Sequence, residues 1–312
     1  AGRAATQALR VPCQWVAVYA RLAPLADTEA AAWLDTRARE GADWLVAVQH
    51  DSGVFPFPDL TDDAAAFREA CRASGAGDCE ARLPRAYELA ELGRARWEAA
   101  GRPSGHLRDG WWFEDAITDP GGLQFDNGIC GRALLDAHAR LGDPRYLEAA
   151  RRAGDWATSR PVVGNFNYNA FSVGLLARLA EVDTATDWAD RALHKARLGV
   201  LPGALADGRW FDPHNARINY HQILLGNLAM LAAVVDDPWV DATLHAAARR
   251  SITEIRQRGA TAFDDGIEAH IGLRELARDD SDTLERLVDG ATDGVTPRAA
   301  GVAWWLAFAA HD

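Results

Sequence analysis

A short polar motif recurs along the chain, each time just before a long apolar segment. Residues 125–129 (F-D-N-G-I) reappear as residues 263–267 (F-D-D-G-I), and residues 167–169 (N-Y-N) reappear as residues 219–221 (N-Y-H). The motifs begin at residues 125, 167, 219 and 263, so successive copies lie 42, 52 and 44 residues apart. Such a period is typical of repeated helix pairs, which stack because no single pair buries its own apolar face.

Two kinds of helix alternate in this repeat. The segments that are hydrophobic over most of a helical circumference are residues 11–24, 129–141, 170–182, 223–235 and 301–310, and this pattern indicates burial on both sides. Residues 146–156 and 241–255 are amphipathic, and each follows an Asp-Pro pair (Asp143-Pro144, Asp237-Pro238) that supplies an N-cap and a first-turn proline.

About six hairpins fit the length, and the one at residues 62–99 is the least regular. The sequence therefore predicts a single all-α domain over residues 1–312, an (α/α)6 toroid with an inner and an outer ring of helices. An open helical solenoid is the alternative.

The connections from an outer helix to the next inner helix would all lie at one end of such a ring. They are polar and aromatic, and they comprise residues 49–63, 110–127, 162–169, 206–221, 259–265 and 293–298. The turns at the other end, residues 141–144 and 235–238, are short. We therefore expect the functional site at the end with the long loops.

Composition excludes several partners. The formal net charge of −12 argues against nucleic acid and against an anionic membrane surface, since both need a basic surface. The sequence contains no run of eighteen apolar residues, which is about the length that a membrane-spanning helix needs. Glycine-rich phosphate-binding motifs are missing, so we expect no nucleotide cofactor. The only lysine, Lys195, lies in a helical Ala/Arg/Leu pattern that predicts a solvated surface residue.

The four cysteines show no zinc-binding spacing. Cys71 and Cys79 flank a Gly/Ala/Ser stretch, and a disulfide across this loop would favour a secreted or periplasmic protein. Two unpaired thiols in a cytoplasmic protein are the alternative. Cys13 and Cys130 lie in helical patterns and are expected to be small core residues. The start at Ala1, without an apolar leader, fits a mature secreted protein or a cytosolic protein that has lost its first residues.

Three features together carry a resemblance: the repeat, the aromatic-acidic loops and the segment F-D-N-G-I-C-G-R-A-L-L-D-A-H-A-R-L-G-D-P-R-Y-L-E-A-A. In these features the chain resembles the (α/α)6-toroid carbohydrate-active enzymes, the six-hairpin glycosidase-like group. The resemblance covers nearly the whole chain and concerns architecture more than one family. Polysaccharide lyases, sugar epimerases and terpene cyclases share related toroids. The resemblance implies a carbohydrate substrate held on aromatic side chains.

The loop at residues 110–127 carries candidates for glycosidic hydrolysis, which needs two carboxyl groups beside the bond. Trp111 and Trp112 are expected to stack on sugar rings, and they precede Glu114 and Asp115. Neighbouring aromatics would keep one of these acids protonated. Asp126 and its repeat equivalent Asp264 are candidates for the base or for a substrate anchor. The alternatives are helix caps for this pair and solvated loop carboxylates for Glu114 and Asp115.

The loop at residues 206–221 is the densest polar cluster. Its candidate site residues are Trp210, His214, Asn215, Arg217, Asn219, Tyr220 and His221. Tyr220 or His221 could remove a proton, while Arg217 could bind a uronate carboxylate. Such a set also suits β-elimination by a lyase. The alternative is that Arg217 pairs with Asp212 and that the asparagines cap helices.

The loop at residues 162–169 offers Asn165, Asn167 and Tyr168 for sugar hydroxyls and for stacking, with turn formation as the alternative. Neither a metal near Cys130 nor calcium at Asp264 is supported by ligand spacing. We predict a glycoside hydrolase without cofactor. A polysaccharide lyase or epimerase is the runner-up, followed by an isoprenoid cyclase or a non-catalytic sugar-binding toroid. Oligomeric state cannot be read from the sequence.

Overall fold

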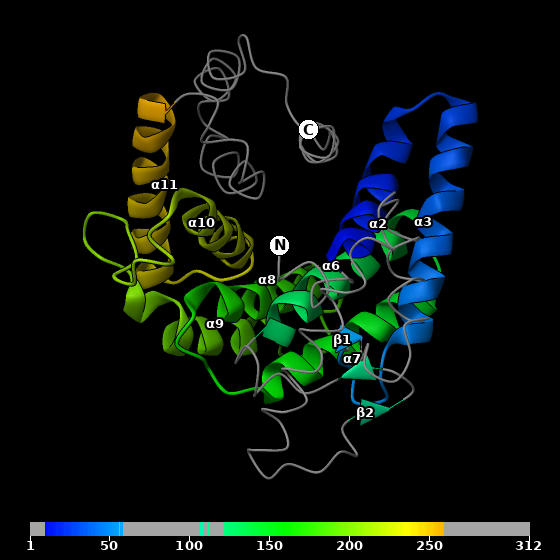
Figure 1. Ribbon diagram of the computed structural model, residues 1–312, viewed down its shortest axis with the longest axis horizontal. Coiled ribbons are helices and arrows are strands. Elements are labelled where there is room, and N and C mark those ends of the chain that lie inside the picture. The colour runs from blue at the N-terminus through cyan, green and yellow to red at the C-terminus, as the bar shows by residue number, and fades with distance from the viewer. Residues whose placement is uncertain (1–9, 56, 59–106, 109–110, 113–121, 259–312) are drawn as a thin grey trace, which may run out of the picture. The chain divides into compact units, whose positions relative to one another are not determined.

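The computed structural model describes residues 10–55, 57–58, 107–108, 111–112 and 122–258, which contain eight α-helices (Figure 1). The chain divides into two compact units, residues 1–160 and residues 161–312, which are taken separately below. The predicted all-α class is confirmed. The predicted helix at residues 301–310 and the predicted hairpin at residues 62–99 lie outside the described residues.

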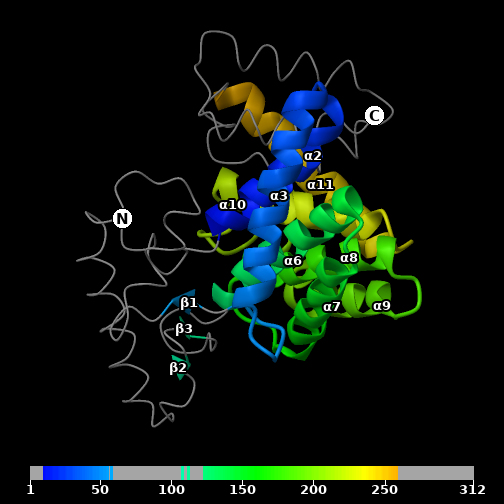
Figure 2. The ribbon, with the colours of Figure 1, turned by 90° about the vertical axis from the view of Figure 1, so that its right-hand side faces the viewer.

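The described part of the first unit contains two helical hairpins. Helix α2 (Arg10–Leu22) is followed by a short 3-10 helix (Ala23–Leu25) and by α3 (Thr28–Val48), and α6 (Gly122–Leu141) is followed by α7 (Pro144–Ser159). Helix α2 packs against both α3 and α6, and α6 packs against α7 (Figure 2). The hairpins α2–α3 and α6–α7 are therefore direct neighbours, with α2 and α6 at their shared core.

Charged pairs join these helices at the ends remote from the long loops. Arg21 of α2 donates two hydrogen bonds to Asp136 of α6, at 2.9 and 2.8 Å. Arg140 of α6 binds Asp35 of α3 in the same two-pronged way, at 2.7 and 2.9 Å. Paired guanidinium–carboxylate bonds fix orientation as well as distance, so they set the register of the hairpins.

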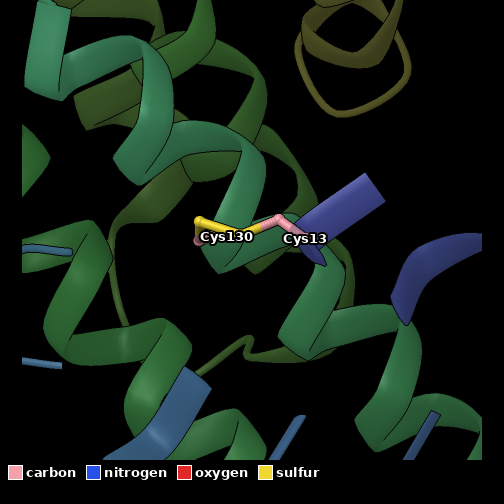
Figure 3. The surroundings of a disulfide bond; sticks show 2 residues. All are labelled: Cys13 and Cys130. Carbon is pink, nitrogen blue, oxygen red and sulfur yellow. A yellow bond between two sulfur atoms is a disulfide. The ribbon is translucent and has the colours of Figure 1, made fainter. Parts of the chain in front are cut away.

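A disulfide joins the first unit's two apolar helices. Cys13 of α2 and Cys130 of α6 are bonded, 117 residues apart in the chain, and both are completely buried (Figure 3). We expected two separate core residues. Their burial is confirmed, but they are covalently paired because α2 and α6 lie side by side. The disulfide considered for Cys71 and Cys79 lies outside the described residues.

Three two-residue strands also belong to the first unit. Strand β3 (Trp111–Trp112) lies between β1 (Phe57–Pro58) and β2 (Leu107–Arg108), and both pairings are antiparallel. Phe57 and Leu107 both pair with Trp112. The two tryptophans therefore sit on the central strand of a small sheet, where the sequence predicted a loop.

Residues 161–258 of the second unit again form two hairpins. They are α8 (Phe166–Val182) with α9 (Trp188–Gly199), and α10 (Ile218–Ala232) with α11 (Pro238–Arg258). A 3-10 helix (Leu201–Gly203) follows α9. Helices α8 and α10 pack against each other, and each packs against its own partner, α9 or α11. The apolar helices α8 and α10 therefore form the core of the unit, and the amphipathic α9 and α11 flank it.

The inner helices begin earlier than the apolar pattern predicts. We expected starts at residues 129, 170 and 223, but α6, α8 and α10 begin at Gly122, Phe166 and Ile218. The three repeat motifs within the described residues thus lie in the first turns of the apolar helices α6, α8 and α10 instead of in loops. The two Asp-Pro starts are confirmed. Asp143 accepts from the Arg145 amide, and Asp237 accepts from the amides of Trp239 and Val240.

The exposure of Lys195 differs from the prediction. Lys195 lies on α9 with 5% of its surface exposed, so the expectation of a solvated side chain is wrong. A buried lysine needs polar or charged partners to offset its desolvation. The helical pattern located the residue correctly but did not reveal which face of α9 is covered.

The same glycine turn precedes the second hairpin of each unit. Gly53 and Gly208 have φ angles of 92° and 85°, in the left-handed region that favours glycine. A Cβ atom would lie 2.1 Å from the Arg152 carbonyl oxygen at Gly53, and 2.2 Å from the Ala246 carbonyl oxygen at Gly208. Each turn therefore rests on the backbone of the following outer helix, α7 or α11.

Candidate functional site

The candidate site in the second unit is the loop at residues 204–217 together with the first turn of α10. Phe211 is 63% exposed and meets Phe166 edge to face, with ring centroids 5.3 Å apart. His214 and Tyr220 stack on each other at 4.0 Å with an interplanar angle of 29°, and both are partly exposed. The loop thus presents aromatic rings to solvent beside the start of an inner helix.

Arg217 adds a positive charge to this surface. It is the residue before α10 begins, and it is exposed. No ion pair links its side chain to any residue in the described part of the chain. The expected alternative, a pair with Asp212, is therefore not observed. The guanidinium remains available for an anionic ligand group.

Asp212 holds the loop in shape instead. Its carboxylate accepts hydrogen bonds from the amides of His214, at 3.0 Å, and Asn215, at 3.3 Å, and also from the Asn215 side chain. Burial raises the pKa of Asp212, but these hydrogen bonds together outweigh burial and hold the pKa below its ordinary value. Only the tendency of aspartate to start turns points to this role in the sequence.

Asn215 and Asn167 connect the loop to the start of α8. Asn215 is completely buried, and its side-chain oxygen accepts from the Asn167 backbone amide at 3.2 Å and from the Asn167 side chain at 2.9 Å. Asn167 also donates to Asn165 at 2.8 Å. Asn165 precedes the helix but forms no capping hydrogen bond, so Asn215 caps α8 from 48 residues away.

Three residues of the repeat motifs each make the same kind of contact, and we call these residues the hairpin tethers. Asn127 of α6 donates to the Ala153 carbonyl at 2.9 Å, and Asn169 of α8 donates to the Gly199 carbonyl at 2.8 Å. His221 of α10 contacts the Ala247 carbonyl through Nε2 at 2.9 Å. Each tether joins the first turns of an inner helix to the outer helix of the same hairpin. The repeat seen in the sequence is therefore structural at these positions.

Two predicted sugar-stacking rings are buried. Trp210 is 1% exposed, its indole N–H donates to the Val200 carbonyl at 3.1 Å, and its ring lies edge to face with His221 at 5.5 Å. Tyr168 is 5% exposed in α8. Neither ring offers a free face, and the contacts of Trp210 are those of a core residue. The exposed rings are those of Phe211, His214 and Tyr220.

Among the remaining candidates, Asp126 belongs to the first unit and Asn219 to the second, and the others lie outside the described residues. Asp126 is completely buried in the second turn of α6, adjacent to the tether Asn127, and it does not cap the helix as the alternative proposed. Asn219 lies on α10, and nothing further is described of its side chain. Glu114, Asp115 and Asp264 lie outside the described residues. The structure brings together Asn165, Asn167 and Asn215, and separately His214 and Tyr220.

The described residues contain no group of three or more His, Cys, Asp or Glu side chains arranged to hold a metal ion. No helix among them is both long and apolar enough to cross a bilayer. No protein-family model matches the sequence, and no curated protein matches it either. The chain is thus an all-helical protein of paired hairpins for which no family is identified.

Proposed function

We propose that the protein is a carbohydrate-active enzyme that acts on an oligo- or polysaccharide containing uronic acid. The observation that carries the proposal is the surface formed by Phe211, His214, Arg217 and Tyr220. Flat aromatic rings bind the C–H faces of sugars, and an exposed guanidinium binds a carboxylate in two-pronged geometry. This loop belongs to one unit and precedes an inner helix, at the end where long loops are expected in a toroid.

Hydrolysis of a glycosidic bond is the proposed reaction. Glu114 or Asp115 would serve as the acid and Asp126 or Asp264 as the base, since two carboxyl groups on either side of the bond suffice. The complete burial of Asp126 supports a special role for this carboxylate, because an aspartate is rarely buried without a structural or chemical reason. Carbohydrate remains the proposed ligand, with no cofactor.

A lyase or epimerase is the second candidate, and one observation favours it. Tyr220 and His214 stack at 4.0 Å beside Arg217 in the chain. A tyrosine oxygen could remove the proton next to a uronate carboxylate that Arg217 neutralises. This alternative places the chemistry on the exposed loop itself and leaves the carboxylates as binding groups.

A substrate panel separates these proposals. The protein is incubated with uronate-containing and neutral polysaccharides while ultraviolet absorbance and new reducing ends are both followed. Reducing ends without the absorbance of an unsaturated uronate indicate a hydrolase, and reducing ends with that absorbance indicate a lyase. Binding without either product contradicts the hydrolase and the lyase. Proton NMR of the recovered sugar then separates an epimerase, which changes the sugar's configuration, from a sugar-binding protein, which leaves it unchanged.

Two variants then assign the reacting group. Tyr220→Phe should lower a lyase rate by roughly 10²- to 10⁴-fold, the usual contribution of a general base, and Glu114→Gln should do the same to a hydrolase. Tyr19→Phe removes a tyrosine hydroxyl from α2, which belongs to the other unit, and is the matched control. If both site variants retain full activity, the proposed reacting groups are wrong.

We also propose that the hairpins close into a toroid, with residues 301–310 supplying a further inner helix. A compact domain of 312 residues has a radius of gyration of about 20 Å. Small-angle X-ray scattering should return a value near this if the ring closes. A clearly larger value would favour the open solenoid.

A further inference from the structure

One of the three hairpin tethers can change its charge, and the other two cannot. Asn127 and Asn169 carry amides, which are neutral at every pH, whereas His221 carries an imidazole. All three are buried at the same place in their hairpins. The hairpin α10–α11 is therefore chemically different from α6–α7 and α8–α9 at an equivalent contact.

The surroundings of His221 specify its neutral form. Its Nε2 faces a carbonyl oxygen, which can only accept, so the proton lies on Nε2 and Nδ1 holds a lone pair. Nδ1 is buried and has no hydrogen-bond partner within the described residues. Protonation would place an N–H and a positive charge at this atom, where nothing accepts the hydrogen.

The charged groups facing the ring come from α11 and from the loop. Arg250 and Glu254 of α11 are paired with each other, and Asp207 of the loop is paired with Arg209. The pKa of His221 lies at about 4 instead of 6.5, mainly because the ring is buried, and the contact with the Ala247 carbonyl partly opposes this effect of burial. Arg250 lowers the pKa further, and Glu254 and Asp207 partly offset it. Desolvation is the main cause.

We propose that His221 is an acid-sensitive tether, which holds α10 to α11 while its ring is neutral and releases the hairpin when the ring takes up a second proton. The released region includes the loop at residues 204–217, since Trp210 of that loop packs on the His221 ring. The loop carries His214 and Arg217, so acid would disorganise this exposed surface while the asparagine tethers stay intact.

The direction of the pH effect follows from the pKa difference. The unfolded chain binds the His221 proton below about pH 6.5, but the folded chain resists it down to about pH 4. Stability is therefore unaffected above pH 6.5, falls as the pH drops from 6.5 to 4, and levels off below that. Across this window the opening equilibrium of the hairpin should shift by roughly two orders of magnitude.

Hydrogen exchange of the full chain, corrected for the intrinsic effect of pH, tests the proposal. Peptides from α10–α11 should open progressively more between pH 7 and pH 4.5, while peptides from the asparagine-tethered α6–α7 serve as the internal control. His221→Gln keeps a donor near the Nε2 position and should abolish the extra opening. His245→Gln, an exposed histidine on the same α11, should leave it unchanged.

A second measurement on the unaltered protein covers the case in which His221→Gln does not fold. Nitrogen NMR of the histidine rings should show His221 protonated at Nε2 alone and titrating well below its ordinary pKa. The proposal is overturned if His221 titrates near 6.5, or if the His221→Gln protein opens with acid as the unaltered protein does.

Discussion

At the scale of single residues, buried amide and imidazole side chains make structural hydrogen bonds, although the sequence analysis selected them as ligand-binding or catalytic candidates. Asn167, Asn215 and His221 were selected because they cluster in polar loops, and the structure shows what each contacts. Their partners lie 26 to 48 residues away in the chain, on other elements. Periodicity is a local property, so it located these residues but could not identify their partners.

Asn215→Ala tests the cap on α8. The substitution leaves the Asn167 backbone amide buried without an acceptor and removes one of the two acceptors of the Asn167 side chain, and each lost buried partner costs about 1–3 kcal/mol. We expect chemical denaturation to show a loss of about 2–4 kcal/mol. Asn165→Ala is the control, and because Asn165 is partly exposed, water can replace it and the loss should stay below about 1 kcal/mol. Equal losses would show that Asn215 is not the cap.

At the scale of elements, the sequence predicted which helices are apolar and which are amphipathic, but it placed the starts of α6, α8 and α10 four to seven residues too late. The apolar pattern starts only after Asn127, Asn169 and His221. These polar residues are helical because outer-helix carbonyls satisfy their side chains, and a hydrophobic pattern carries no such information. The sequence predicted which loop carries the exposed rings of the candidate site, but it did not predict which individual rings in that loop are exposed.

The glycine turns are also element-scale features, and alanine substitution tests them. Gly53→Ala and Gly208→Ala combine left-handed backbone strain with a Cβ atom pressed against a backbone carbonyl, so each should cost about 3 kcal/mol or more. Gly142 has a φ of 71° with open space around its Cβ position. Gly142→Ala should therefore cost only about 1 kcal/mol in the same denaturation experiment. Similar costs at all three sites would mean that the close approach to α7 and α11 is wrong.

At the scale of the whole molecule, both units use the same plan of two hairpins with a glycine turn between them. Gly53 and Asn127 are separated by 74 residues, however, whereas Gly208 and His221 are separated by only 13. The longer segment of the first unit lies mostly outside the described residues, so the hairpin predicted at residues 62–99 stays a prediction.

The disulfide should contribute strongly to global stability. It closes a loop of 117 residues in the unfolded chain, for which loop-closure entropy predicts about 4–5 kcal/mol. The Cys13→Ser, Cys130→Ser double variant should lose that amount in denaturation. In the native protein, thiol reductants should leave the bond intact until denaturant is added, because both sulfurs are buried. Rapid reduction without denaturant would contradict this burial.

The bond between Cys13 and Cys130 also makes the peptide between them part of a covalent ring. A protease that cuts the backbone once anywhere from residue 14 to residue 129 opens the ring without dividing the molecule. The cleaved chain should therefore migrate as one species on a non-reducing gel and as two fragments after reduction. The segment between Gly53 and Asn127 lies inside this ring, so a single cut there should leave both pieces of the first unit attached to each other.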